Sequence, residues 1–267
     1  MQRAVHRSGT LVYPAASLSL PAIQAYKPSA ELDPFVEYFW VVRWDVETPQ
    51  VSQTIPQPRI HLTIEDDRIL VYGIDRRQFT RQLTGKGVVL GTAFRPAGFR
   101  AFTNIAINTL QDQVVPASTL FRAPPGYPPI HDPTDEDLVH FTGDLLTAQQ
   151  PIVDPLAQWC ERLVQRADSD RSIIRVQQLA DIAEASERLL QRRFAEYVGI
   201  SPKWVIQRSR IMNLVADCNA RRAIDWASIA VELGFSDQAH LIRTFRAIVG
   251  ITPDAYLKRV IARESPG

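Results

Sequence analysis

Arginine and glutamine side chains recur at helical spacing in two stretches of the C-terminal third of this 267-residue chain. Both residue types can make paired hydrogen bonds to the edges of guanine and adenine in the major groove of DNA. They also cover the solvent-exposed face of many ordinary helices, and for any one residue we weigh the two roles equally. Because the set occurs twice, base reading is favoured for the following candidates: Arg188, Gln191, Arg192, Gln238, His240 and Arg243.

These side chains belong to a unit of the sequence that is duplicated. The stretch from Leu190 to Arg208 returns as the stretch from Leu241 to Arg259, and the segments before each stretch also correspond. Ser201 and Thr252 exchange one hydroxyl residue for another. The matching pairs are Leu190/Leu241, Arg192/Arg243, Phe194/Phe245, Val198/Val249, Gly199/Gly250, Ile200/Ile251, Pro202/Pro253, Arg208/Arg259 and Ser186/Ser236.

The second copy predicts two short helices around a tight turn. Asp225 can cap the first helix, Gly234 suits its left-handed end, and Ser236 can cap the second helix. Gly250 ends that second helix, and Thr252-Pro253 begins another with a hydroxyl cap and a first-turn proline. The predicted buried stripe of the second helix has a 3.6-residue period and consists of Leu241, Phe245, Ile248 and Val249.

The first copy repeats this pattern around a turn at Glu184-Ala185. Ser186 is the expected cap, and Leu190, Phe194 and Val198 form the buried stripe of the helix that follows. Two short helices at a steep angle are the helix-turn-helix arrangement. We therefore expect an all-α domain over residues 168–267 with two helix-turn-helix units.

The residues from 173 to 260 resemble the AraC/XylS family of bacterial transcription regulators. The most specific part is Ile229 to Gln238, IAVELGFSDQ, followed by Arg243-Thr244-Phe245 and Gly250-Ile251-Thr252-Pro253. The resemblance implies that a long helix, about Pro202 to Cys218, joins the two units and sets their second helices into successive major-groove segments. Such segments lie about 34 Å apart along the duplex.

The chain departs from the family pattern at several positions near the turns. Ala239, His240 and Leu241 replace the usual small polar, aromatic and Phe residues, and Glu184 stands where Gly is frequent. These changes leave the expected core intact and put the base preference in doubt. The candidates for phosphate contacts, from their charge or their place near helix N-termini, are Ser186, Ser201, Lys203, Arg208, Arg210, Ser236 and Thr252.

The composition agrees with a cytoplasmic protein of about two domains. Residues 168–267 hold 15 Lys/Arg and 12 Asp/Glu, whereas residues 1–167 hold 15 and 17, a modest bias toward phosphate binding on the C-terminal side. No apolar run predicts a membrane span, and the N-terminus lacks the layout of a signal peptide. Cys160 and Cys218 are expected to be small buried hydrophobes rather than a disulfide or metal site.

The N-terminal residues 1–122 read as a β-rich sensor or assembly domain. Alternating residues in Ile60 to Glu65 indicate a half-buried strand, and Asp66-Asp67 is a plausible hairpin turn. Short strands this close together favour an antiparallel barrel or sandwich, so the fold class is α+β. The five predicted strands are Glu37 to Val46, Ile60 to Glu65, Arg68 to Ile74, Gln78 to Leu83 and Val88 to Arg95.

The segment from Phe94 to Phe99, FRPAGF, resembles the N-terminal domain of a branch of AraC-like regulators, which implies a cupin-like barrel. Two residues are weak candidates for binding an effector. His61 lies on a predicted strand, although a lone histidine is more often a surface or hydrogen-bonded residue. Arg95 could pair with an anionic effector, and a structural salt bridge is the favoured alternative.

Residues 123–167 are expected to form a linker. Five prolines between Pro124 and Pro133 predict a stiff extended connector. Two amphipathic helices then follow, at Glu136 to Ala148 and Pro155 to Arg166. They suit either a homodimer contact or packing against a neighbouring domain, with equal weight.

An enzyme, a metal site and a bound cofactor are not expected. The five histidines lack metal-ligand spacing, and the sequence has no GxSxG, GxxxxGK[ST] or GxGxxG motif. The expected partners are double-stranded DNA, RNA polymerase, a small-molecule effector and a second copy of the chain, with no membrane partner. Two alternatives stay open: an N-terminal domain that only dimerises or binds a partner protein, and one that is catalytic.

Overall fold

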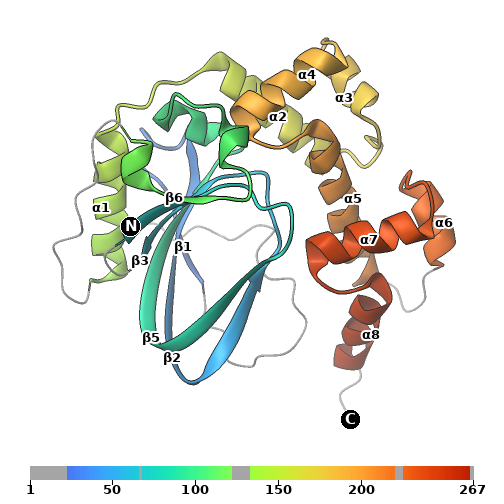
Figure 1. Cartoon of the computed structure of the whole chain (residues 1–267), viewed down its shortest axis with the longest axis horizontal. Coiled ribbons are helices and arrows are strands. Elements are labelled where there is room, and N and C mark those ends of the chain that lie inside the picture. The colour runs from blue at the N-terminus through green and yellow to red at the C-terminus, as the bar shows by residue number, and fades with distance from the viewer. Residues whose placement is uncertain (1–22, 66–67, 122–132, 220–224, 265–267) are drawn as a thin grey trace.

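Alternating apolar and polar residues build an N-terminal antiparallel sheet in the computed structural model, which describes residues 23–65, 68–121, 133–219 and 225–264. The described strands form one six-stranded sheet in the order β1-β2-β5-β3-β4-β6 (Figure 1). Helices follow it in the chain, so the predicted class of an antiparallel β domain and an all-α domain is confirmed. The strands are β1 (Gln24–Tyr26), β2 (Val36–Thr54), β3 (His61–Glu65), β4 (Arg68–Tyr72), β5 (Phe79–Phe94) and β6 (Val114–Pro116).

The longest pairing joins β2 to β5. It runs from Val36 opposite Phe94 to Thr54 opposite Phe79, with an irregularity between Val46 and Gln50. Pro49 lies in that gap, and proline cannot donate to a ladder. The two strands predicted at 78–83 and 88–95 are therefore wrong as separate elements: Gly85, with a φ of 56°, lets one strand continue.

The structure confirms some of the other predicted strands and adds two that were not predicted. β3 and β4 pair as a hairpin, although the expected turn at Asp66-Asp67 lies outside the described residues. β1 and β6 were not predicted because three residues are too few to show an alternating pattern. Short 3₁₀ turns complete this part of the chain: η1 (Gly98–Phe102), η2 (Ile107–Leu110) and η3 (Ala117–Thr119).

The two helices of the predicted linker pack within the chain. Tyr26 donates a hydrogen bond from its hydroxyl to the Asp135 carboxylate, 2.6 Å away, at the start of the first helix. The second buries Cys160 and Leu163 against the sheet domain and the helices after it. The packing alternative is thus confirmed, while the homodimer contact stays a prediction and most of the proline-rich connector lies outside the described residues. These helices are α1 (Asp135–Thr147) and α2 (Pro155–Ser169).

The C-terminal helices follow the predicted duplication. The long connecting helix α5 runs over Pro202–Cys218, the bounds expected from the sequence. A π-helical turn, η4 (Phe194–Val198), extends α4. Among the described residues, no helix is both long and apolar enough to cross a bilayer. The remaining helices are α3 (Val176–Ile182), α4 (Glu187–Arg193), α6 (Trp226–Glu232), α7 (Gln238–Val249) and α8 (Pro253–Glu264).

The buried residues form two clusters that do not coincide with the sequence domains. The larger cluster runs from the sheet through α2 into the first helix-turn-helix unit, where Leu190 and Phe194 are fully buried. The smaller cluster holds the second unit around Phe245 and includes Ile55 from the end of β2. Packing is therefore continuous across residue 168, and the predicted domain boundaries stay predictions.

Replacing Phe194 or Phe245 with Ala should lower the free energy of unfolding by about 3–5 kcal/mol, because each ring fills a buried site that cannot collapse. Urea denaturation followed by circular dichroism measures this loss. Arg192→Ala and Arg243→Ala change exposed residues of the same helices and should stay within about 0.5 kcal/mol of the parent. A loss below about 1 kcal/mol for either phenylalanine would place the buried face wrongly.

Candidate nucleic-acid interface and ligand pocket

The first helix-turn-helix unit presents its candidate base-reading residues to solvent. Ser186 caps α4 by accepting a hydrogen bond from the Leu189 backbone N–H, 3.2 Å away. With Leu190 and Phe194 facing the core, the opposite face is open. The exposed residues on that face are Arg188, Gln191 and Arg192.

The second unit has the predicted helices and a corrected cap. Asp237, and not Ser236 as expected, accepts a hydrogen bond from the His240 backbone N–H at 2.7 Å. Ser236 instead contacts the His240 ring through Oγ and Nδ1, 3.0 Å apart. A carboxylate at this position also interacts favourably with the positive end of the helix dipole. The repeated serine in the two units predicts a hydroxyl cap instead.

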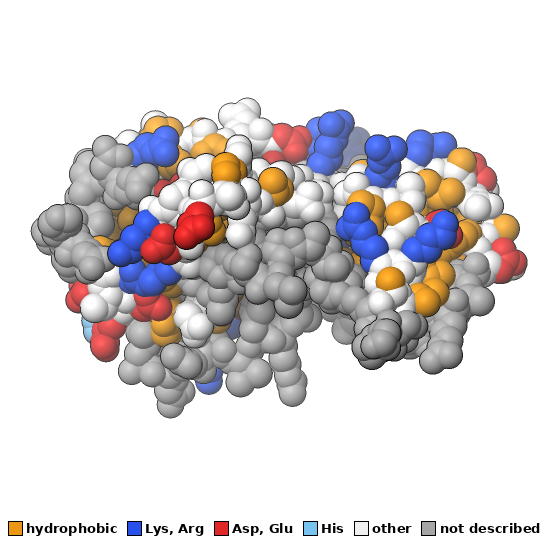
Figure 2. Space-filling model, turned by 90° about the horizontal axis from the view of Figure 1, so that it is seen from below, with side chains coloured by type: hydrophobic (Ala, Val, Ile, Leu, Met, Phe, Trp, Pro, Cys, Tyr) orange, Lys and Arg blue, Asp and Glu red, His pale blue; other side chains and the backbone are white. Residues whose placement is uncertain are grey.

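Figure 2 shows Lys and Arg side chains spread over the C-terminal part of the molecule, on the right of the view. On α7, Gln238 and Arg243 are exposed, whereas His240 is half-buried and stands edge-on to Phe235 with ring centroids 5.2 Å apart. The His240 ring therefore packs against the turn residues and is less available for a base contact. The exposed base-reading candidates of the second unit are Gln238 and Arg243.

Most candidates for phosphate contacts are accessible. Ser186, Ser201, Lys203 and Ser236 are exposed, and Thr252 is half-buried. The Ser201 hydroxyl accepts a hydrogen bond from the Trp204 backbone N–H at 3.2 Å, which makes it the cap of α5. The hydroxyl groups of Ser186, Ser201 and Thr252 accept hydrogen bonds from first-turn backbone N–H groups, so they lie at helix N-termini, where anions bind favourably.

Arg208 and Arg210 are the exceptions, because both are buried. Arg208 donates from Nε to the Pro56 carbonyl at 2.6 Å and lies 3.5 Å from the Asp168 carboxylate. The Arg210 guanidinium lies 3.9 Å above the Phe235 ring, and burial lowers its pKa to about 10. The expectation that these two arginines contact phosphate is wrong, because both side chains are buried in the protein interior.

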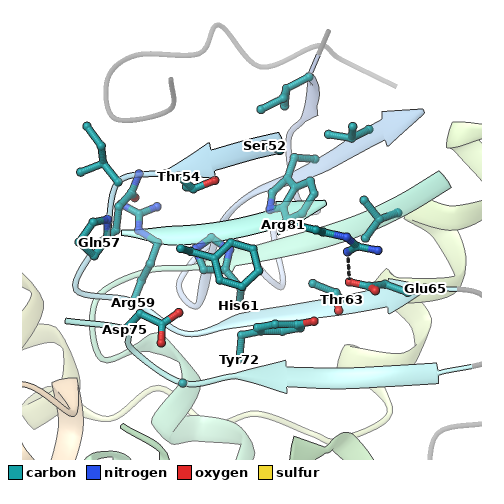
Figure 3. A pocket seen from close by; sticks show the side chains of 18 of the residues that line it. Ser52, Thr54, Gln57, Arg59, His61, Thr63, Glu65, Tyr72, Asp75 and Arg81 are labelled. Carbon is teal, nitrogen blue, oxygen red and sulfur yellow. Dashed lines mark hydrogen bonds and ion pairs between the residues drawn. The ribbon is translucent and has the colours of Figure 1, made fainter. Parts of the chain in front are cut away.

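A cavity of about 180 Å³ opens on the sheet, between strands that the sequence placed in the N-terminal domain. Its lining includes the aromatic side chains of Tyr38, Trp40, Tyr72 and Phe79. Figure 3 shows Tyr72 beside His61 in this cavity. Such a mixture of apolar walls and a few polar groups is typical of small-molecule sites. Sequence reasoning proposed only His61 of this set.

A glycine in β5 makes room for the Trp40 ring. Gly91 is the cross-strand partner of Trp40, and a Cβ atom there would lie 2.0 Å from the indole. Gly87 accommodates Trp44 in the same way, with a Cβ at 2.3 Å. The two glycines are four residues apart and therefore lie on the same face of β5, a spacing that could have indicated tryptophan packing.

His61 borders the cavity with a neutral ring. Desolvation by burial, and then the nearby Arg59 charge, lower its pKa to about 3. The Trp40 ring stands edge-on to it with centroids 6.3 Å apart, and its buried Nδ1 has no hydrogen-bond partner among the described residues. The imidazole is therefore a neutral hydrogen-bonding group rather than a cation at physiological pH.

Charged side chains of the cavity are mostly paired. Arg81 and Glu65 lie 2.6 Å apart within it, and Arg59 is 2.6 Å from Glu37. Asp75 has no ion pair or hydrogen bond in the described part of the chain. Burial, and then the neighbouring Asp112 charge, raise the pKa of the Asp75 carboxyl.

Arg95, the other candidate for effector binding, lies outside the cavity lining. It donates to the Asp33 carbonyl at 2.5 Å and pairs with the Asp33 carboxylate at 3.1 Å and with Glu161 at 3.4 Å. The structure therefore gives Arg95 the structural salt bridge that was its favoured alternative.

Two loops at one end of the cavity touch the second helix-turn-helix unit. Ile55 lies in the core of that unit, while Pro56 holds Arg208. Gln78 receives the end of α7: its backbone N–H donates to the Ala247 carbonyl at 3.2 Å, and its Nε2 donates to the Val249 carbonyl at 3.0 Å. We call these contacts the sheet-end joint. It links the cavity to a candidate recognition helix.

The comparisons with family models match two separate parts of the chain. Residues 179–259 match a model described as a helix-turn-helix domain, which is of the AraC type. The chain carries an AraC-type helix-turn-helix domain. Residues 24–116 match a model described as a domain of unknown function (DUF6597). The AraC-type domain identifies the chain as a DNA-binding transcription regulator, as its motif indicated. No curated protein matches the chain significantly.

Solved structures with some similarity include apo ToxT from Vibrio cholerae strain SCE256, at 12% identity, 83% coverage of this chain, 97% of that chain and a TM-score of 0.41. The DNA-binding domain of AdpA in complex with a target DNA has 25% identity, coverages of 43% and 100%, and a TM-score of 0.33. The C-terminal domain of AraT from Geobacillus stearothermophilus has 19% identity, coverages of 39% and 85%, and the same TM-score of 0.33.

Gly91→Ala should displace the Trp40 ring and damage the cavity, because the added methyl group overlaps the indole. We expect a loss of about 1–3 kcal/mol in unfolding free energy, the usual cost of overpacking, with a shift of the tryptophan emission spectrum. Gly143→Ala is the matched control, because a Cβ in this α1 position meets open space. Its stability should stay equal or rise by up to about 1 kcal/mol. An unchanged emission spectrum in Gly91→Ala would contradict this placement of Trp40.

Proposed function

We propose that this AraC-type regulator binds specific duplex DNA through α4 and α7, under the control of a small molecule held in the sheet cavity. The observation that carries the proposal is the sheet-end joint. The same loops that border the cavity, at Ile55-Pro56 and at Asp75 to Gln78, also contact the second helix-turn-helix unit.

The DNA part of the proposal is supported by the two exposed faces. Arg188, Gln191 and Arg192 on α4 correspond in the duplication to the face that carries Gln238 and Arg243 on α7. These side chains lie opposite buried stripes and are free to reach base edges. Lys203 and the capped N-termini of α5 and α8 are suited to phosphate contacts, which add affinity without sequence preference.

Control by a ligand depends on how each helix-turn-helix unit contacts the sheet domain. The first unit touches the sheet domain at η2, where a Cβ on Gly199 would lie 2.6 Å from Ile107. The second unit is held by the sheet-end joint. A ligand that moves the joint would shift α7 relative to α4, and the spacing of two recognition helices decides whether both reach successive grooves.

An N-terminal domain that only dimerises or binds a partner protein is the alternative function. The formed cavity favours an effector, because a pure assembly domain has no use for a hollow site lined by aromatic side chains. The cavity also argues for a ligand rather than catalysis, since among its described lining residues most charged groups are already paired.

Binding-site selection with the full chain tests which residues read bases. Arg188→Ala, Gln191→Ala and Arg192→Ala should each relax the preference at one base position by about 1–3 kcal/mol. Lys203→Ala should weaken binding to all sequences alike and lower the salt slope by about one phosphate contact. Arg68→Ala, an exposed arginine on the sheet, is the charge control and should leave both unchanged. If all three α4 variants keep the parent preference, α4 does not read bases.

A thermal-shift screen of compact molecules should find a ligand that stabilises the full chain and changes its affinity for selected DNA. At a hundredfold excess over Kd the stabilisation is about 2.7 kcal/mol. Ser52→Phe places a ring into the cavity and should abolish both responses while basal DNA binding remains. Gln53→Phe, next along β2 and outside the lining, should respond like the parent. If stabilisation is equal in both variants, the ligand binds elsewhere.

A further inference from the structure

One charge in the cavity lacks a counter-charge. Arg81 is paired with Glu65, and Arg59 with Glu37, each at 2.6 Å. Asp75 lines the same cavity, yet no ion pair or hydrogen bond reaches its carboxylate from any residue that the structure describes. The next arginine along the chain, Arg76, is committed to Asp112 at 2.8 Å. Among the described lining residues, Asp75 is therefore a charged group with no opposite charge beside it. Arg59 has Glu37 at 2.6 Å, although its buried Nε and Nη1 lack a hydrogen-bond acceptor.

The Asp75 carboxylate gains from a cationic partner. It is partly removed from water, and an unpaired charge in such a place costs free energy that an opposite charge returns. Figure 3 shows Asp75 at the edge of the space that His61 and Tyr72 border. Burial and the Asp112 charge both raise the pKa of this carboxyl, and a bound cation would oppose them.

The walls next to Asp75 suit a flat ring and a positive charge. Tyr72 and Phe79 meet edge to face with centroids 5.9 Å apart, and Trp40 lies on the neighbouring strand β2 against Gly91. The faces of aromatic rings attract cations. His61 adds no competing charge, because its ring is neutral with a pKa of about 3, and its unpartnered Nδ1 offers one hydrogen-bonding group.

The volume limits the size of the occupant. At about 180 Å³ the cavity is slightly larger than the space of about 150 Å³ that holds benzene in an engineered protein core. One aromatic ring with a short side chain fits this space.

We propose that the cavity binds a compact aromatic amine, with its ammonium group at Asp75 and its ring among Trp40, Tyr72 and Phe79. This inference rests on the proposed function, since it names the class of effector that the cavity would take. An aromatic carboxylate fits less well. It would meet the unpaired Asp75 charge, and the Arg81 guanidinium already lies 2.6 Å from the Glu65 carboxylate.

Isothermal titration of the full chain with three probes of similar size tests the class of ligand. The probes are phenethylamine, phenethyl alcohol and hydrocinnamate, which are cationic, neutral and anionic. We expect the amine to bind at least about tenfold more tightly than either of the others, as one added ion pair in a partly dry site allows. Quenching of tryptophan emission should accompany binding, because Trp40 lines the cavity.

Asp75→Asn removes the charge and keeps the shape. It should weaken phenethylamine binding about tenfold and leave phenethyl alcohol unchanged, and its melting temperature should not fall, since it removes an unpaired charge. Asp45→Asn changes an exposed carboxylate of β2 outside the lining and should bind all three probes like the parent. An equal loss for amine and alcohol in Asp75→Asn would mean a damaged cavity and would overturn the assignment.

The remaining outcomes separate the ligand class from the function. If hydrocinnamate binds most tightly, or if Asp75→Asn binds the amine as the parent does, the amine assignment is wrong while effector control stands. If none of the probes binds, the amine assignment again fails. Effector control then falls only if the wider thermal-shift screen also finds no ligand that Ser52→Phe excludes.

Discussion

The pairing of β2 with β5 is the interaction on which the rest of the molecule depends. Its first part begins in the hydrophobic core with Val36, Phe39 and Val41 and runs to Val46 opposite Gly85. Its second part, from Gln50 to Thr54, extends beyond the irregularity at Pro49. The ladder ends with Thr54 opposite Phe79. The residues just outside that last pair, Ile55 and Gln78, are therefore neighbours, and both contact the second helix-turn-helix unit. One antiparallel pair thus forms a cavity wall and holds the candidate DNA-binding surface.

The duplicated units are held to the sheet domain at equivalent glycines. Gly199 and Gly250 both adopt positive φ, 90° and 87°, at the end of their second helices. A Cβ on Gly199 would meet Ile107, and one on Gly250 would meet the Gln78 side chain at 2.1 Å. Glycine is thus required twice over, for its backbone conformation and for close approach. The duplication that positions two recognition helices also supplies two attachment points of the same geometry.

The sequence predicted the helical half of the fold much better than the sheet. A helix buries one stripe at 3.6-residue spacing, so the spacing alone predicts that Leu241, Phe245 and Val249 are buried. Gly85 and Gly87 interrupt the strand pattern of β5 in the sequence, and only the register shows that Gly87 lies opposite Trp44, where a Cβ would be 2.3 Å from the indole. The charge of Arg208 predicts a phosphate contact, whereas the structure buries this side chain against the Pro56 carbonyl, which lies far away in the chain.

The candidate cavity could not be read from the sequence for a related physical reason. Its walls come from β2, β3, β4 and β5, and each strand contributes alternate residues whose meeting depends on register. Asp75 follows β4 in a loop and has no motif around it, so its lack of a partner appears only when every neighbour is known. The candidate base-reading residues are different, because a local helix face exposes them whatever the rest of the chain does. The DNA-binding part of this regulator is therefore encoded locally, and its proposed control depends on the long-range pairing of β2 with β5.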